Sequence, residues 1–232
     1  MSWFVRFSRF GTAHMVRSQD KNMSCSMASI VMVNFKQKKG LMFAGMAAGA
    51  SLQVSGIPGA SYVGATLSSA ARDYAIKSEG EVYKIYEKYE GGPHDFNTTG
   101  SNPLLFPKVL AELGLGQWEC VNVGDTGVTQ ALIDSNKAGS PVIITSVWDG
   151  GGAHSICCDD TFGFFGTTYL ACCDPWDGEL RITSATVGAK IRYDGGDTPI
   201  SSGTFFGGNA HAYDPKVNNK GWIEAWITRK KA

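Results

Sequence analysis

Charge of either sign is scarce in this sequence, and the little there is balances. Only 18% of the 232 residues are charged, and the 21 basic residues equal the 21 acidic ones. A chain without net positive charge has no bulk electrostatic attraction to a phosphate backbone, so we expect no nucleic-acid partner. The hydrophobic share of 43% is that of a globular protein. The length suits a single domain over 1–232 that has room for an insertion.

Two segments lack what a membrane-targeted chain would need. The N-terminal segment has no continuous apolar stretch of the kind found in a cleaved signal peptide, because Arg6 and Arg9 interrupt it, and we expect a short edge strand there. Residues 40–71 have no charge, but glycines, serines, Gln53 and Pro58 dilute their hydrophobicity. We therefore predict no membrane span. A buried helix and then a Gly/Pro loop lining a substrate cleft are expected instead, within an insertion at about 40–100.

Cysteine pairs with the spacing of a metal site are also missing. The sequence has no C-x-x-C, and its six cysteines are Cys25, Cys120, Cys157, Cys158, Cys172 and Cys173. Adjacent residues of a strand point to opposite faces, so neither adjacent pair is well placed to share one ion. We expect buried free thiols, no metal or other cofactor, and a reducing compartment such as the cytoplasm of the producing cell.

Hydrophobic periodicity separates an earlier helical part from a later strand-rich part. Helices are expected over 25–39 with Gly40 after the end, over 67–90 with a Ser78–Glu81 capping box, after Pro103 up to Gly114, and over 127–138. Strands are expected over 142–147, 153–158, 167–173 and 221–229. This order predicts the α+β class, with a helical half at about 1–140 packed on an antiparallel sheet or half-barrel at about 141–232.

Cys25 differs from the other cysteines because it lies at the expected start of a helix, after the candidate N-cap Ser24. The positive end of a helix dipole lowers the pKa of a thiol and so favours the reactive thiolate. Gln19 lies six residues earlier, where its amide could donate to an oxyanion beside the backbone N–H of Cys25, and Asn22 could do the same. The alternatives are a core cysteine and an ordinary surface glutamine.

His154 is the best candidate base among four histidines, because it follows three glycines and an alanine and begins a strand. Asp174 ends the next strand, and Pro175 keeps it extended. A turn at about 164–167 would return Asp174 to the side of His154, where a carboxylate fixes the imidazole tautomer. The competing carboxylates are Asp149, Asp159, Asp160 and Asp177, and solvated or capping roles are expected for His14, His94 and His211.

Taken in order, these motifs resemble the papain-like cysteine peptidases, most of all the bacterial branch that includes bacteriocin-processing peptidases and secreted effector proteases. The matching segments are Gln19 before Cys25-Ser-Met-Ala-Ser, Gly139-Ser-Pro-Val-Ile-Ile, Gly151-Gly-Ala-His154 and Asp174-Pro-Trp176, over residues 19–176. Ser26 departs from the Gly or Trp that is more usual after the nucleophile.

The resemblance implies a papain-like fold and a cysteine endopeptidase with a Cys25–His154–Asp174 triad and Gln19 in the oxyanion hole. It implies no metal or organic cofactor and a protein or peptide substrate. By analogy we expect a monomeric bacterial effector or toxin that leaves the producer by a dedicated secretion system and acts in a target-cell cytosol. A proteinaceous inhibitor or immunity protein would be its partner.

Two alternatives stay open at this point. The same triad could act on another bond, as in a peptidoglycan amidase, a glutamine deamidase or a transglutaminase. The fold could also serve as a catalytically inactive binding module.

Overall fold

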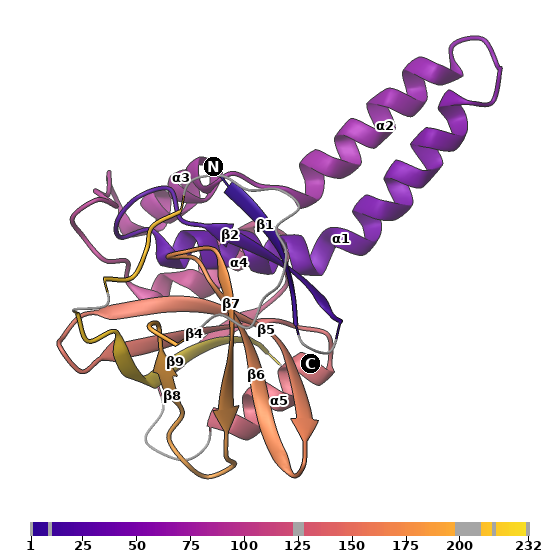
Figure 1. Cartoon of the computed structure of the whole chain (residues 1–232). Coiled ribbons are helices and arrows are strands. Elements are labelled where there is room, and N and C mark those ends of the chain that lie inside the picture. The colour runs from indigo at the N-terminus through magenta and orange to yellow at the C-terminus, as the bar shows by residue number, and fades with distance from the viewer. Residues whose placement is uncertain (1, 9–10, 123–127, 198–209, 215–216, 231–232) are drawn as a thin grey trace.

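The computed structural model describes residues 2–8, 11–122, 128–197, 210–214 and 217–230. Helices and strands are mixed, as the predicted α+β class requires (Figure 1). The helices are α1 (Cys25–Gln53), α2 (Ala60–Ala75), α3 (Glu79–Glu90), the short 3-10 helix η1 (Pro103–Leu105), α4 (Phe106–Glu112) and α5 (Val128–Lys137). The strands are β1 (Ser2–Phe7), β2 (Ala13–Ser18), β3 (Trp118–Asn122), β4 (Val142–Trp148), β5 (Ala153–Phe164), β6 (Thr167–Asp174), β7 (Glu179–Ala185), β8 (Arg192–Asp194) and β9 (Lys220–Arg229).

Seven strands form one antiparallel sheet in the order β3-β9-β4-β5-β6-β7, with β8 paired to β9. The four strands predicted after Pro141 correspond to β4, β5, β6 and β9, although β5 extends six residues further, to Phe164. The turn between β5 and β6 falls at Phe165-Gly166, where both residues have positive φ. That conformation is typical of a two-residue hairpin turn and agrees with the predicted position.

Two hydrophobic cores lie on the two faces of this sheet. The first half of α1 covers one face, and Met27 and Ile30 pack there in one core with Ile143 of β4. On the other face Leu132 of α5 packs in a second core with Ile144, the next residue of β4. The period of two along a strand therefore supplies both cores.

The adjacent cysteines follow the same alternation. Cys157 and Cys173 are register partners and belong to the core under α1, whereas Cys158 and Cys172 are partners in the core under α5. All six thiols of the chain are free, and these four are buried. The prediction that neighbouring thiols lie on opposite faces and stay unpaired is confirmed.

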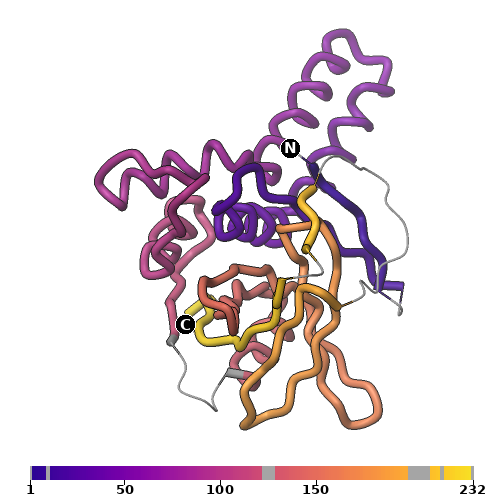
Figure 2. The backbone as a smooth tube through the Cα atoms, turned by 60° about the vertical axis from the view of Figure 1, so that its left-hand side comes forward, coloured from indigo at the N-terminus to yellow at the C-terminus, as the bar shows by residue number. Residues whose placement is uncertain are grey.

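The segment 40–71 departs from its prediction. Helix α1 does not end at Gly40 but continues to Gln53, and with α2 it forms an exposed helical hairpin that extends away from the body in both Figure 1 and Figure 2. A single glycine costs a helix only about 1 kcal/mol, which the packing against α2 offsets. The loop at 54–59 forms the tip of this hairpin and does not line the cavity at Cys25. Over the described ranges, no helix combines the length and the apolarity that crossing a membrane needs.

Other element boundaries also differ from the predicted ones. The single helix expected over 67–90 is two helices, because residues 76–78 separate α2 from α3, and the capping box of Ser78 and Glu81 starts α3 as predicted. The N-terminal strand is half of a hairpin, β1 with β2. Strand β3 pairs with the end of β9, so the sheet begins at Trp118 in sequence, ahead of the expected boundary near residue 140. Helix α5 covers residues 128–137 of the predicted 127–138, whose first residue lies outside the described residues.

Candidate active site

Cys25 is the first residue of α1, as its sequence context predicts. The first turn of a helix has backbone N–H groups without partners in the helix, and it carries the positive end of the helix dipole. The Cys25 sulfur accepts a hydrogen bond from the backbone N–H of Ser155 at 3.4 Å, and Ser29 of the same helix donates to the Ser155 carbonyl at 3.1 Å. These two bonds fix the start of α1 against β5, the strand that carries His154.

A buried ionic network holds the loop before the nucleophile. The Glu79 carboxylate is fully buried and accepts hydrogen bonds from the Ser24 hydroxyl at 2.8 Å and the Tyr83 hydroxyl at 2.7 Å. It also accepts from the backbone N–H of Asp20 and pairs with buried Arg17 at 3.3 Å. Ser24 is the N-cap residue, but its side chain makes no capping bond, because it is engaged with Glu79. The network thus fixes the path of residues 20–24, while the Ser24 side chain leaves the N–H groups at the start of α1 uncapped.

His154 and Asp174 meet as predicted from the β5–β6 hairpin. The Nε2 atom of His154 lies 2.7 Å from Oδ1 of Asp174, and Asp174 is fully buried. The backbone N–H of Trp176 donates to the same oxygen at 2.8 Å. Because Nε2 is engaged with Asp174, the other ring nitrogen, Nδ1, is left for Cys25, whose thiolate interacts electrostatically with the imidazole.

The charges of the three groups reinforce one another. Burial alone would raise the pKa of the Cys25 thiol, but the His154 imidazolium and the Ser155 N–H outweigh it, and the pKa is lowered. Burial would lower the pKa of His154, but the Asp174 carboxylate and the Cys25 thiolate raise it to about 10. The Asp174 pKa is lowered for the complementary reason, since charged partners overcome its burial. The site therefore favours a thiolate–imidazolium pair near neutral pH.

Three further side chains contact the Asp174 carboxylate, and none of them was expected from the sequence. The hydroxyls of Tyr193 and Tyr213 donate to Oδ2, the latter at 2.8 Å, and Arg181 lies 3.5 Å from the same oxygen. A buried carboxylate with this many donors stays ionised and cannot rotate. These residues come from β7, β8 and a segment near β9, so no local motif links them to Asp174.

Gln19 lies beside the site in a different role from the one expected of it. Its Nε2 donates to the carbonyls of Lys21 at 2.7 Å and Asn22 at 2.9 Å, which uses both amide protons within the loop. Its backbone N–H donates to the carbonyl of Pro175 at 2.7 Å and so ties this loop to the Asp174 segment. Asn22, the alternative donor, lines the cavity together with Cys25.

A cavity of about 370 Å³ opens over Cys25 and His154. Trp148 stacks on the His154 ring with the ring centroids 5.6 Å apart, and Tyr213 meets that ring edge-on at 6.4 Å. Trp176, two residues after Asp174, is also part of the lining. These aromatic walls limit access of water to the ion pair and leave an apolar surface for a substrate side chain.

The competing carboxylates have other partners. Asp149 pairs with Arg192, and Asp177 pairs with Arg181. Asp159 accepts from His14 at 2.7 Å and from Lys36 at 2.9 Å, so His14 is a buried hydrogen-bond partner rather than a solvated residue. His94 bonds Glu90, and His211 stacks on Trp176, a residue of the cavity wall.

One cluster has the composition of a metal site, and it lies outside the triad. The ligand atoms of His14, Asp159 and Cys173 fall within 4.8 Å of one another, and all three residues are buried. Burial raises the pKa of the Cys173 thiol, whereas metal ligation needs the thiolate. The ammonium of Lys36 already neutralises Asp159. These residues are better explained as an ion-pair cluster than as a cation site.

Comparison with known proteins does not place the chain in a family. No protein-family model matches it, and no curated protein is similar to it.

Proposed function

We propose that this protein is a cysteine peptidase of the papain-like type, which cleaves peptide bonds through Cys25, His154 and Asp174. The observation that supports this proposal most strongly is the arrangement of the three groups. A cysteine at a helix start and a histidine that interacts with it electrostatically line one cavity, and a fully buried carboxylate lies behind that histidine. This is the geometry of an activated thiol nucleophile.

In the proposed reaction the Cys25 thiolate attacks the carbonyl carbon of the scissile bond. The N–H groups at the start of α1 stabilise the resulting oxyanion, with Asn22 or a reoriented Gln19 as an additional donor. His154 gives its Nδ1 proton to the leaving amine, and a thioester forms on Cys25. Water then attacks the thioester while His154 accepts its proton, and the acid is released. Asp174 keeps the imidazole oriented and stabilises its charged form.

The proposal includes a biological setting. The protein would be a bacterial effector or toxin that cleaves a protein substrate in the cytosol of a target cell, and the producing cell would need an inhibitor of it. The cavity over Cys25 is the surface that such an inhibitor would cover.

Thiol reactivity tests the proposal directly. The protein is treated briefly with iodoacetamide near pH 6, and the adducts are counted by intact mass spectrometry. An ordinary thiol is only about 0.3% thiolate at this pH, so the thiolate fraction of Cys25 can exceed that of an ordinary cysteine by up to about 300-fold. Part of that gain is offset because a thiolate of lower pKa is less nucleophilic. We expect one adduct that forms at least about tenfold faster than any other.

The matched variants are Cys25→Ala, His154→Ala and, as a control, Cys120→Ala, since burial raises the pKa of the half-buried Cys120 thiol. The first two should lose the rapid adduct and the third should keep it. Labelling that is unchanged in His154→Ala would contradict the triad. Incubation with a denatured protein mixture then separates the reactions: new N-termini that need Cys25 indicate a peptidase, whereas ammonia release without cleavage indicates a deamidase.

A further inference from the structure

The second half of α1 and all of α2 form an arm, residues 40–75, that plays no part in the triad. The arm stands clear of the body in Figure 1 and in the rotated view of Figure 2. From Gly40 to Ala71 it contains no Asp, Glu, Lys or Arg. A surface helix of a globular protein normally has a charged outer face. The composition of this arm therefore indicates that something other than water covers its outer surface.

Small residues form the contact between the two helices of the arm. Gly45 faces Ala71 so closely that a Cβ at Gly45 would lie 2.6 Å from the Ala71 Cβ. Gly49 and Gly64 face each other, and a Cβ on Gly49 would lie 2.5 Å from the Gly64 carbonyl oxygen. The spacing Gly45-x-x-x-Gly49 with small residues opposite is a close-packing arrangement that is favoured where lipid surrounds a helix pair.

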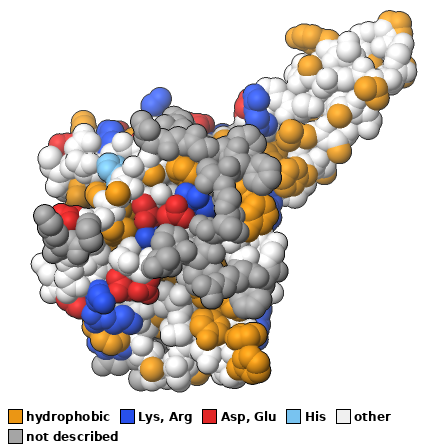
Figure 3. All heavy atoms as spheres, in the orientation of Figure 1, with side chains coloured by type: hydrophobic (Ala, Val, Ile, Leu, Met, Phe, Trp, Pro, Cys, Tyr) orange, Lys and Arg blue, Asp and Glu red, His pale blue; other side chains and the backbone are white. Residues whose placement is uncertain are grey.

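The large apolar side chains of the arm point outward instead of into this contact. Of the exposed large apolar side chains in the described chain, ten lie between Leu41 and Ile76 and six lie elsewhere. At or near the tip, Val54 is 83%, Tyr62 77% and Ile57 63% exposed, and at the root Leu41 is 66% exposed. Figure 3 shows apolar side chains at the tip and along the arm, with no basic or acidic colour beyond its base. In a water-soluble helix pair this distribution would be reversed.

Three hydroxyl groups of the arm are satisfied by its own backbone. Ser51 donates to the carbonyl of Ala47 at 3.0 Å, Thr66 to that of Tyr62 at 3.0 Å, and Ser55 to that of Leu52 at 2.8 Å. Each of these bonds is made to a backbone carbonyl three or four residues earlier. A polar side chain that enters hydrocarbon needs such an internal partner, since the lipid offers none.

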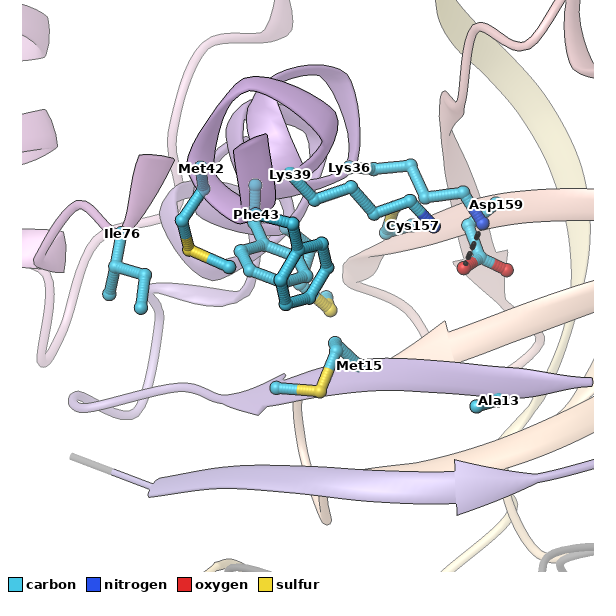
Figure 4. A pocket seen from close by; sticks show the side chains of 11 residues that line it. Ala13, Met15, Lys36, Lys39, Met42, Phe43, Ile76, Cys157 and Asp159 are labelled. Carbon is cyan, nitrogen blue, oxygen red and sulfur yellow. Dashed lines mark hydrogen bonds and ion pairs between the residues drawn. The ribbon is translucent and has the colours of Figure 1, made fainter. Parts of the chain in front are cut away.

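Positive charge gathers where the arm joins the body. The segments 36–39 and 72–77 carry five basic residues and one acidic residue, Asp73. Lys36 is paired with Asp159, Lys77 is paired with Glu81, and Lys38 is buried. Lys39 and Arg72, the latter 3.5 Å from Asp73, are therefore the basic side chains that could face a membrane. Figure 4 shows this root: Lys36 and Lys39 extend along a cavity of about 380 Å³ whose apolar lining includes Met42, Phe43 and Ile76. Basic side chains at such a boundary favour anionic phospholipid headgroups, and they would repel the same segment of a second copy that lay parallel to it.

We propose that this arm inserts its tip into one leaflet of an anionic phospholipid membrane and so anchors the protein to the membrane surface. The length fits insertion without crossing. The 14 residues from Gly40 to Gln53 extend about 21 Å at 1.5 Å per residue, whereas the hydrocarbon core is about 30 Å thick. The apolar outer surface contacts acyl chains, the small-residue contact stays closed, and the basic root lies among the headgroups. This inference is independent of the proposed function, because it holds equally for a protein with an inactive triad.

Vesicle flotation tests the proposal. Full-length Cys25→Ala protein is mixed with vesicles of phosphatidylcholine containing about 30 mol% phosphatidylglycerol, and the floating fraction is measured. The tip variant carries Val54→Glu and Ile57→Glu, two highly exposed positions where folding should not suffer. The matched control carries Leu104→Glu and Val187→Glu, which are 61% and 58% exposed on the body. We expect the parent and the control to float, and the tip variant to bind at least tenfold more weakly.

Vesicles of phosphatidylcholine alone should also bind the parent protein more weakly. Failure of the parent to float, or equal flotation of the tip variant, would overturn the proposal. Light scattering on the lipid-free protein tests whether the arm instead binds the arm of a second copy. A concentration-dependent dimer that the tip variant abolishes would assign the apolar surface to self-association. The tip substitutions are also made in the protein that keeps Cys25. Its rate of labelling by iodoacetamide should be unchanged, so the outcome of the membrane test does not depend on the triad.

Discussion

The substitution Asp174→Asn removes one negative charge from the centre of the site while keeping the shape of the side chain. An asparagine in the same position keeps one acceptor oxygen for the ring of His154, and its amide can face the hydroxyls of Tyr193 and Tyr213. The charge itself has no replacement. Because Asp174 is fully buried, water does not screen the loss.

The size of the effect follows from the His154–Asp174 bond of 2.7 Å. A hydrogen bond to a charged partner contributes about 1.5–3 kcal/mol, and one pKa unit corresponds to about 1.4 kcal/mol. The His154 pKa, about 10 in the parent protein, should therefore fall by about 1–2 units in Asp174→Asn. Titration of the ring by nuclear magnetic resonance in histidine-labelled protein measures this shift directly.

The same change alters stability against pH in a defined direction. The folded-state pKa of His154 lies above its ordinary value of 6.5, so its contribution to the free energy of unfolding is complete below pH 6.5 and is lost as the pH rises towards 10. The lowered pKa of Cys25 gives the opposite slope over part of this range, so denaturant unfolding is measured in a Cys25→Ala background. The decline should appear there and should be smaller when Asp174→Asn is added. The variant should also lose about 3 kcal/mol at neutral pH, as expected when a buried ion pair is broken. Equal ring titrations in the two proteins would refute the reasoning.

Three further predictions use other parts of the structure. Tyr213→Phe removes one hydrogen bond to Asp174 and should lower the free energy of unfolding by about 1–2 kcal/mol in urea, whereas no change would mean that this bond contributes nothing. Glu79→Gln weakens the buried network behind the loop at 20–24 and should cost about 3 kcal/mol and slow alkylation of the nucleophile; normal rates would show that the loop does not depend on the charge. Gly64→Val forces the arm helices apart and should speed proteolysis within 41–74, while Gly92→Val, at a position with open space, serves as the control, and equal cleavage of both would contradict the close packing.

The parts of the site that are local in sequence could be predicted. A cysteine at a helix start, a histidine after glycines and an aspartate before proline each carry a signal within a few residues. The hairpin between β5 and β6 then brings His154 and Asp174 together, because its turn lies at Phe165-Gly166. The register of that hairpin shifts between Cys158 and Asp160, and no sequence pattern indicates this irregularity.

The parts that depend on distant packing could not be predicted. Tyr193 and Tyr213 reach Asp174 only because β8 and the segment before β9 return to it. Glu79 reads as an ordinary residue of a helix's first turn, yet it is fully buried beneath the loop at 20–24. Lack of charge usually means burial, so the sequence predicts a buried helix where the structure has the exposed arm. The small-residue contact between the two helices leaves their large apolar side chains exposed.

The alternation of the adjacent cysteines gives the molecule a built-in probe of its own unfolding. Cys157 and Cys173 report on the core beneath α1, and Cys158 and Cys172 report on the core beneath α5. Partial unfolding that releases one helix would expose one pair of thiols before the other. A pulse of alkylating reagent at rising denaturant, read by peptide mapping, would therefore rank the stability of the two faces of a single sheet without any added label.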